Sequence, residues 1–579
     1  MKYGLILILF TVIAPACAQW TPSVSSFDTV MIDHRTGGKL DSLDLLFRSL
    51  QTSPVNNSDF TNGIIPVNFL IKNQNGLFAA SSDWGTDVMR YCGLPHIGFA
   101  YGFGAAGIQT AKLQYEQVFA KKLLVNLDYL NDRANGLMRN SAHRFSDARL
   151  SIINRSSRYT FKFVGEDRLL ERGLNGGLQE PYNVVDFPLI FQPIRKLDAS
   201  EKVRLSHLKL NNYFDFLKSD SIRSMGISSE HSLHVQRRIF SENGNLVDHY
   251  SEIYIDTFST RDSYQLSSTS HEAGLYYKSS NLFATFLASG RYWKYYNQTN
   301  QLDTTEFGLH DKIHFGKGKL KISHEGRLNL IGAGREWESR LVGEFANHKI
   351  EWTGILDLES KWPVVFLRSY HANNFMYDLP VYERQFRSSL SNSLSVLLGR
   401  FPVKLFHESV LLKDNYFWNG SNWQNDLFPN ISFHSISLGS EFNFKSLNFH
   451  PKYTFTISDS PVKFRPDHIA QSRIFLKGGL FKGKKPLAYI GADVIWQSEF
   501  GVLDLVPAMG TYVMNTALPL QKSYLNVHGF AGFQIDEFRF YVRFENIGYF
   551  WNDREIQIVN GYTIPSGILR LGLTWDFFN

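Results

Sequence analysis

The chain is poor in cysteine and has no long hydrophobic run. Its 579 residues include two cysteines, Cys17 and Cys92, and Cys17 falls within a segment that we expect to be removed. The mature chain would then keep one cysteine, which excludes an intramolecular disulfide as a source of stability. No segment after Ile13 has about 18 consecutive apolar residues, which argues against a transmembrane helix. The net charge of +6 is small for this length and is spread along the chain, so it does not suggest a nucleic-acid-binding protein.

The chain nevertheless contains much apolar and aromatic material. It is 43% hydrophobic and 15% aromatic, while its mean hydropathy is slightly negative. A membrane protein built of helices would be strongly positive on that scale. In a transmembrane β-barrel, half of each strand is polar, so this composition is typical of a barrel.

The N-terminus has the pattern of a secretory signal peptide, predicted over residues 1–18. A short positive start is followed by Leu5 to Ile13, an apolar run too short to span a bilayer. Ala16 and Ala18 then place small residues at the two positions that a signal peptidase recognises, which predicts cleavage before Gln19.

A lipoprotein is the alternative for this segment, with Cys17 as the lipidated residue. The residue three positions before it is Ala14, where leucine is usual, so we favour the cleaved peptide. Residues 19–95 follow as a short irregular leader, rich in Ser, Asp, Asn and Gly, which we expect to be periplasmic or lumenal.

The C-terminus alternates between apolar and polar residues without a break. Leu569, Leu571, Leu573, Trp575 and Phe577 point one way, and the residues between them point the other way. This is typical of the closing strand of an outer-membrane β-barrel, with lipid on one side and a polar lumen on the other.

The same design recurs in Leu447–Ile457, Phe538–Glu545 and Tyr159–Phe163. On these strands and on the C-terminal strand, the alternation predicts the following lumen-facing charges: Lys162, Lys452, Arg539, Arg543, Glu545, Arg570 and Asp576. Rings of charge set the ion preference of a pore, so the excess of cations predicts a mild anion preference.

Short and long connections alternate along residues 96–579. Short ones lie near Lys121, Ser156, Lys445 and Asp536, and long ones lie between them, as in bacterial barrels with short periplasmic turns and long extracellular loops. We therefore predict an all-β, antiparallel transmembrane β-barrel of about 22 strands, within a range of 18–24, in the cell outer membrane.

Several motifs favour structural over catalytic interpretations. The stretch Gly102–Gly107 matches a dinucleotide fingerprint, but a strand follows it where that motif needs a helix, so a glycine turn is favoured. No HExxH or GxSxG motif is present. We therefore expect no catalytic, metal or cofactor site. The aromatic stretch Asn415–Trp423 could hold a sugar, but an aromatic girdle at the membrane interface is the favoured interpretation.

Several stretches in order resemble the outer-membrane β-barrel porin family of Bacteroidota. They are Leu40–Phe47, Gln114–Phe119, Asn154–Tyr159, Asn175-Gly176-Gly177, Arg543–Asn546 and Trp575–Phe577. The chain departs from the family pattern in its leader, where the usual aspartate-threonine pattern is weak. The resemblance implies a barrel, and it implies that the C-terminal residues Leu569, Leu571, Leu573, Trp575 and Phe577 act as an insertion signal for the barrel-assembly machinery.

The expected function is a porin-like channel for passive diffusion of small hydrophilic solutes. A plugged barrel that serves as a structural or accessory subunit of an outer-membrane complex is the main alternative. A TonB-type transporter is less favoured, because only about 77 residues lie between the signal peptide and the first strand. A barrel enzyme is less favoured too. The expected partners are outer-membrane lipids, the barrel-assembly machinery and small hydrophilic solutes but no nucleic acid; a homo-oligomer or a larger outer-membrane complex stays open.

Overall fold

The computed structural model describes residues 29–33, 87–91 and 94–578, with internal gaps at 121, 181, 219–222, 333–334, 364, 380–381, 419–422, 425–429, 461–462, 464, 482–485, 516, 552 and 565. The predicted signal cleavage residues Ala16, Ala18 and Gln19 lie outside this part of the chain. Within it, no helix has the length and apolar character needed to cross a membrane.

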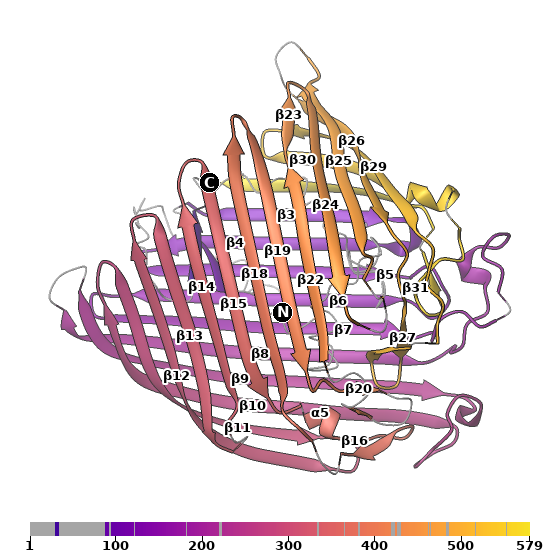
Figure 1. Cartoon of the computed structure of the whole chain (residues 1–579), viewed down its shortest axis with the longest axis horizontal. Coiled ribbons are helices and arrows are strands. Elements are labelled where there is room, and N and C mark those ends of the chain that lie inside the picture. The colour runs from indigo at the N-terminus through magenta and orange to yellow at the C-terminus, as the bar shows by residue number, and fades with distance from the viewer. Residues whose placement is uncertain are drawn as a thin grey trace, which may run out of the picture.

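Twenty-two antiparallel strands close into a single barrel, as the alternating pattern predicted (Figure 1). The first half of the barrel consists of β3 (His96–Gly104), β4 (Gln109–Phe119), β5 (Leu123–Ala134), β6 (His143–Arg155), β7 (Tyr159–Gly173), β8 (Ser200–Lys218), β9 (Ser224–Asn243), β10 (Ser259–Lys278), β11 (Leu282–Tyr296), β12 (Gln301–Lys317) and β13 (Leu320–Ile331).

The second half consists of β14 (Trp337–Ala346), β15 (Ile350–Lys361), β18 (Gln385–Leu398), β19 (Phe401–Lys413), β22 (Asn430–Ser440) with its continuation β23 (Phe442–Phe444), β24 (Leu447–Ser458), β25 (His468–Gly479), β26 (Leu487–Gln497), β29 (Tyr524–Ile535), β30 (Phe538–Glu545) and β33 (Ile568–Phe578). Strand β33 pairs with β30 on one side and with β3 on the other, which closes the ring and removes every sheet edge.

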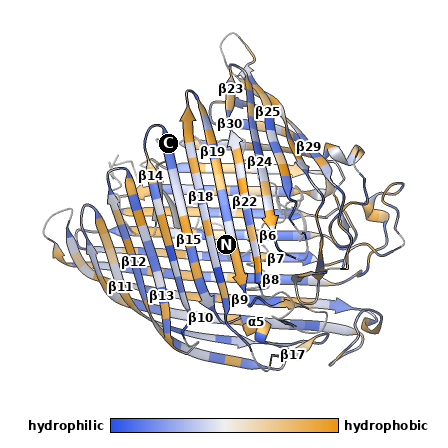
Figure 2. Cartoon of the chain, in the orientation of Figure 1, coloured by the Kyte–Doolittle hydropathy of each residue, from blue (hydrophilic) through white to orange (hydrophobic). Residues whose placement is uncertain are grey.

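Alternation along the strands separates an apolar outer wall from a polar inner wall. On β24, Tyr453, Phe455 and Ile457 are exposed, whereas Thr454 and Thr456 between them are buried. Polar and apolar residues consequently mix along each strand instead of forming separate apolar strands (Figure 2). This arrangement suits a wall between lipid and an aqueous lumen.

The strand pair β22–β24 is interrupted at one point, for a reason visible in the sequence. Pairing runs as far as Gly439 opposite Lys452 and resumes with Phe442 opposite Phe449. Between these points lies Pro451, which has no backbone N–H to donate to the ladder. The strand that runs from Asn430 to Phe444 is therefore split into β22 and β23.

Short turns lie at one end of the barrel and long loops at the other. The predicted turns near Lys121, Ser156, Lys445 and Asp536 each join two neighbouring strands. Strand β3 begins and strand β33 ends at this same end of the barrel. The loop elements α5, β16, β20, β27 and β31 gather at the opposite end of the barrel in Figure 1. By the rule for bacterial barrels, the turns are periplasmic and the loops extracellular.

The remaining elements are not strands of the ring. Two strands of the leader, β1 (Thr29–Asp33) and β2 (Asp87–Tyr91), pair in parallel. The loops carry α5 (Val365–Arg368), β16 (Ser369–His371), β17 (Met376–Asp378), β20 (Phe417–Trp418), β21 (Trp423–Gln424), β27 (Leu503–Val506), β28 (Thr511–Met514), β31 (Gln557–Val559), β32 (Tyr562–Thr563) and the short 3₁₀ turns η1 (Ala105–Gly107), η2 (Leu189–Phe191), η3 (Leu246–Asp248) and η4 (Ile547–Phe550). The glycine stretch Gly102–Gly107 is thus the end of β3 followed by η1, the strand-to-strand turn that the sequence favoured.

Candidate transport lumen

The extracellular loops fold inward and pack on the inner wall. The segment 362–384, between β15 and β18, buries Phe366, Leu367 and Tyr370 against Tyr264 of β10 and Tyr295 of β11. Phe366 and Tyr370 meet edge to face with ring centroids 5.0 Å apart. Their contacts are with wall residues that alternate away from the lipid, so the segment lies inside the barrel mouth.

A hairpin made by β27 and β28 reaches the wall formed by β8 and β9. Arg238 of β9, which is 1% exposed, donates from Nη1 to the carbonyl oxygen of Ala508 over 2.6 Å and from Nη2 to that of Pro507 over 2.7 Å. The same guanidinium forms an ion pair with the buried carboxylate of Glu201, which also pairs with Arg172 at 2.6 Å. The hairpin starts from β26 and β29, which are far from β9 around the ring in either direction. It therefore crosses the lumen.

Two further loops lock onto this hairpin. Strand β27 pairs in parallel with β31, through Leu503 and Val559, and so joins the loop after β26 to the loop after β30. The loop after β7 joins them where the amide of Leu178 donates to the carbonyl of Gly561 over 2.7 Å. A sheet of four short strands, β28-β27-β31-β32, results.

The Asn-Gly-Gly motif noted in the sequence makes this contact. Gly176 and Gly177 both have positive φ, 69° and 86°, and the amide of Gly177 donates to the side-chain oxygen of Asn175 over 3.0 Å. A Cβ on Gly177 would lie 3.0 Å from the backbone of Gly561, whose own φ is 78°. Two glycines are needed here because two backbones touch and both adopt the left-handed conformation.

These loops share one hydrophobic core with the upper wall of β19 and β22. Leu178, Phe500, Leu503 and Val559 are completely buried in it. Wall residues of β19 and β22 complete the cluster, including Val410, Leu412, Ile431 and Phe433. The loops are thus a folded unit rather than independent surface segments.

Beside this unit lies a cavity of about 870 Å³, between the inner wall of β9–β15 and segment 362–384. Aromatic side chains and paired charges line it. Glu306 accepts from the indole nitrogen of Trp293 over 2.8 Å and pairs with Arg291 at 3.0 Å. Lys361 and Glu338 pair at 2.6 Å, and Trp362 meets Tyr382 edge to face. Such a mixture can hold a small polar solute by stacking and charge-assisted hydrogen bonds.

One acid of this cavity, Glu336, lies in the loop between β13 and β14. Burial raises its pKa, and the nearby carboxylate of Glu306 adds to the effect, while the amide of Trp362, which donates to it over 2.9 Å, acts in the opposite direction. Glu336 therefore takes up a proton at a higher pH than an ordinary glutamate does, and the charge of the cavity changes with it.

Another titratable cluster anchors the loop after β7. The ammonium of Lys196 lies 2.5 Å from Glu242 and donates to Tyr250 over 3.0 Å. Burial lowers the pKa of Lys196, and Glu242 partly offsets this. Burial also raises the pKa of Tyr250. The cluster is an anchor for the loops rather than a group free to bind solute.

Three of the predicted lumen-facing charges lie in one cluster. Arg543, Glu545 and Arg570 form a continuous chain on the inner wall: Arg570 pairs with Glu545 at 2.9 Å, and Arg543 pairs with Glu545 at 3.4 Å and with Asp493 of β26 at 2.7 Å. Arg473 of β25 extends the chain by pairing with Asp493 at 2.6 Å.

The other predicted charges are dispersed. Arg539 lies 3.8 Å from Asp576, which also contacts His96 at 3.3 Å. Lys162 is buried at 4% exposure, whereas Lys452 is exposed. Asp493, Arg473 and Arg238 could not be identified from the sequence. The alternation within a strand shows which side a residue faces but not which residue of another segment it contacts.

The residues predicted as an insertion signal lie on the outer wall of β33. Leu569, Trp575 and Phe577 are 40–45% exposed. Trp575 stacks on Phe577 with centroids 4.5 Å apart and meets Phe538 of β30 edge to face. Leu571 and Leu573 lie between them on the same face, half-buried.

The aromatic stretch Asn415–Trp423 was assigned to the membrane girdle, and this is wrong for its first aromatics. Tyr416 is 2% exposed and packs in the core of segment 362–384, and Phe417 is 5% exposed in the shared loop core. Loops that fold into the lumen provide their own apolar core, so their aromatics need not face lipid.

One arrangement on the outer wall was not anticipated. His324 of β13 hydrogen-bonds to Asp311 of β12 at 2.9 Å through Nδ1 and to Ser339 of β14 at 3.1 Å through Nε2. Gly326 leaves room for it, since a Cβ there would lie 2.6 Å from Asp311. The backbone amides of these central strands take part in the sheet ladder. The hydrogen bonds of His324 to Asp311 and Ser339 give these polar side chains partners on an otherwise apolar wall.

The comparisons with known proteins agree with the architecture. Residues 94–579, most of the chain, match the model of a family described as "Putative porin". No curated protein matches the sequence significantly.

Solved structures of similar shape include three receptors or transporters. The FrpB iron transporter from Neisseria meningitidis (F5-1 variant) has 8% identity and a TM-score of 0.57, covering 84% of this chain and 82% of that one. The siderophore receptor PirA from Acinetobacter baumannii has 10% identity and a TM-score of 0.56, covering 84% and 80%. The ferric-catecholate import receptor Fiu from K12 E. coli has 8% identity and a TM-score of 0.55, covering 85% and 83%. At such low identity these likenesses establish the fold alone. Together with the family match over the whole barrel, they lead to the conclusion that the chain belongs to this porin family and resides in the cell outer membrane.

Proposed function

We propose that the protein is a gated porin, through which small hydrophilic solutes diffuse passively once the extracellular loops move. The observation that carries this proposal is the contact of Arg238 with the carbonyls of Pro507 and Ala508 across the lumen. A barrel of this strand number is too wide for wall side chains to fill, so an inserted element must decide whether solutes pass.

The hairpin tip is suited to the role of a gate. It is attached to the wall of β9 by charge-assisted hydrogen bonds, each of which contributes about 1.5–3 kcal/mol. Tyr370 adds a longer hydrogen bond to Ala508 at 3.4 Å. A few polar contacts of this kind can break and re-form, whereas the strands of the wall cannot separate without losing their whole ladder.

The cavity suggests the class of solute. Trp293 and Trp362 provide aromatic faces, and Arg291, Glu306 and Lys361 provide charges that are already paired. A small solute with hydroxyl or mixed charged groups could exchange hydrogen bonds with these pairs without stripping a lone charge of water.

The test is the single-channel conductance of the purified full chain in planar bilayers. A variant in which a short Gly-Ser linker replaces residues 504–513 should conduct more and stay open longer than the wild type. Lys404→Gln serves as a matched control, because it neutralises a cation of the barrel wall that pairs with Glu441, away from the loops. Equal conductance of wild type and linker variant would contradict the gate.

The alternative function, a structural or accessory subunit, is favoured by the same interlocking of loops. It predicts that neither protein conducts, and that a stoichiometric partner co-purifies with the wild type. A TonB-type transporter would instead show uptake that depends on an energised inner membrane.

A further inference from the structure

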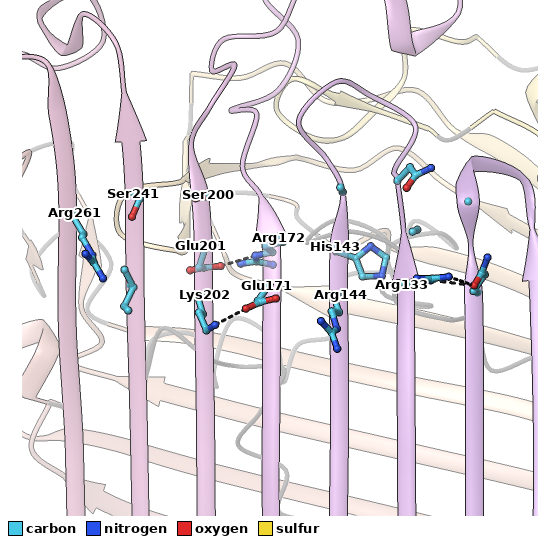
Figure 3. A pocket seen from close by; sticks show the side chains of 16 residues that line it. Arg133, His143, Arg144, Glu171, Arg172, Ser200, Glu201, Lys202, Ser241 and Arg261 are labelled. Atoms are coloured by element: carbon cyan, nitrogen blue, oxygen red, sulfur yellow. Dashed lines mark hydrogen bonds and ion pairs between the residues drawn. The ribbon is translucent and has the colours of Figure 1, made fainter. Parts of the chain in front are cut away.

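The outer wall of β5–β10 carries a cluster of basic side chains close to the extracellular loops, here termed the outer basic groove. It comprises Arg133, Arg144, Lys202, Arg204, Arg237 and Arg261, all of them exposed. Most of them line a groove of about 1000 Å³. Figure 3 shows Arg133 and Arg144 on the neighbouring strands β5 and β6, and Lys202 and Arg261 further along the same wall on β8 and β10.

The sheet register brings like charges face to face. Arg133 lies directly opposite Arg144 on the next strand, and Arg204 lies directly opposite Arg237. Like charges at directly opposed positions of a sheet destabilise it. Glu171 lies directly opposite Arg144 on the other side and offsets part of this cost; a bound anion would relieve the rest.

Acidic neighbours neutralise only part of the groove. Glu171 pairs with Lys202 at 2.5 Å, and Asp167 pairs with Arg204 at 3.0 Å. Arg133 is held by the neutral side chain of Gln109 at 3.0 Å. Within the part of the chain that the structure describes, Arg144 and Arg237 have no carboxylate within ion-pair distance. The groove thus keeps a net positive charge.

The groove lies where the wall changes from polar to apolar. Four residues along β8 from Arg204, on the same face, Leu208 is 45% exposed, and four residues along β9 from Arg237, Leu233 is 38% exposed. On β5 the change passes through Tyr129, an aromatic residue suited to the membrane interface, at 40% exposure. A lipid whose acyl chains cover these leucines would have its headgroup at the level of the arginines.

We infer that the outer basic groove binds the phosphorylated headgroup of an acylated glycolipid of the outer leaflet. Arginine guanidinium groups suit phosphate because they offer paired donors in a fixed plane. Exposed Ser200 and the hydroxyl of Ser241 line the same groove and can donate to further headgroup oxygens. The acyl chains would lie along the apolar wall below, so charge and apolar contact select the same molecule.

The experiment measures binding of diphosphoryl lipid A to the purified full chain in a non-ionic detergent. The double variant Arg144→Gln/Arg237→Gln should bind the lipid about 10-fold or more weakly. The reason is that each basic residue near a charged headgroup contributes separately to the electrostatic attraction. Glu171→Gln, which removes an acid from the groove, should bind more tightly. Lys317→Gln/Lys319→Gln, which removes two exposed lysines at the periplasmic turn, should bind as the wild type does.

Correct folding of each variant is checked by the heat-induced shift in its electrophoretic mobility. Raising the salt concentration should weaken binding of the wild type more than that of the double variant. Unchanged affinity of the double variant would overturn the inference. Equal binding of phosphatidylethanolamine would overturn it too, by assigning the contact to acyl chains alone, and displacement of the lipid by an equal concentration of inorganic phosphate would assign the site to free phosphate.

Discussion

The wall of β7–β11 and the wall of β25–β33 use buried charge for different purposes. In the first, strands of 15–20 residues rise towards the loops, and Arg238 and Glu201 attach an inserted hairpin. In the second, strands of 8–12 residues are just long enough to cross a membrane, and Arg543 and Asp493 pair within the wall itself. In the wall of β7–β11, here called the tall side, buried charges anchor a separate element. In the wall of β25–β33, the short side, they hold neighbouring strands together.

Removal of Arg238 should have the largest effect, because it detaches the hairpin of β27 and β28 from the tall side. Arg238→Ala leaves Glu201 paired with Arg172 alone and frees the carbonyls of Pro507 and Ala508, and loss of one partner of a buried pair costs about 3–5 kcal/mol. We expect limited proteolysis of intact cells to cut the hairpin between β27 and β28. A hairpin as resistant as that of the wild type would show that Arg238 is not its anchor.

The equivalent change on the short side should leave the loops in place. Asp493→Asn removes the carboxylate shared by Arg473 and Arg543, and we expect a loss of about 2 kcal/mol, because hydrogen bonds to charged groups contribute about 1.5–3 kcal/mol. The midpoint of the heat-induced mobility shift should fall, while the loops stay resistant to protease. If the loops became sensitive, the two walls would not be independent.

A smaller effect is expected where two loops touch. Gly561→Ala adds a Cβ at a φ of 78° and 3.1 Å from the backbone of Gly177, which we expect to cost about 1–3 kcal/mol of loop stability. Gly318→Ala, also at positive φ but with open space around it, provides the control for backbone strain alone. Longer channel openings in Gly561→Ala than in Gly318→Ala would be the expected result.

The smallest effect concerns pH. Because the pKa of Glu336 is raised in the folded protein, its neutral form is favoured, so the stability it contributes is fully present below the ordinary pKa and is lost as the pH rises through the folded pKa. On the same titration the cavity gains negative charge. Occupancy by an anionic solute should therefore fall as the pH rises, and Glu336→Gln should flatten that dependence. An equally steep dependence in Glu336→Gln would assign the titration to another group.

The strands were predictable because their signal is local. A two-faced strand can be predicted from as few as three residues, such as Tyr453, Thr454 and Phe455. A turn such as Lys445-Ser446 then fixes the register of the strand. The loop unit was not predictable, because its contacts are non-local: Arg238 meets a carbonyl 270 residues away. Nothing near Arg238 distinguishes it from Arg237, which faces the opposite side of the wall.

The Asn-Gly-Gly motif lies between these extremes. Paired glycines predict a backbone that needs positive φ or close approach, and both hold for Gly177. The partner, Gly561, could not be inferred, because the pairing depends on which loops meet above the closed ring. The sequence thus indicated that the backbone at Gly177 has an unusual conformation, but it did not indicate which segment contacts it.

The parallel pairing of Leu503 with Val559 also bears on the order in which the protein is made. Its two strands belong to loops near the C-terminus, while the wall that receives the hairpin is synthesised much earlier. The hairpin can dock on β9 only after the strands that carry it, β26 and β29, have been synthesised. Docking of the hairpin thus depends on a nearly complete chain.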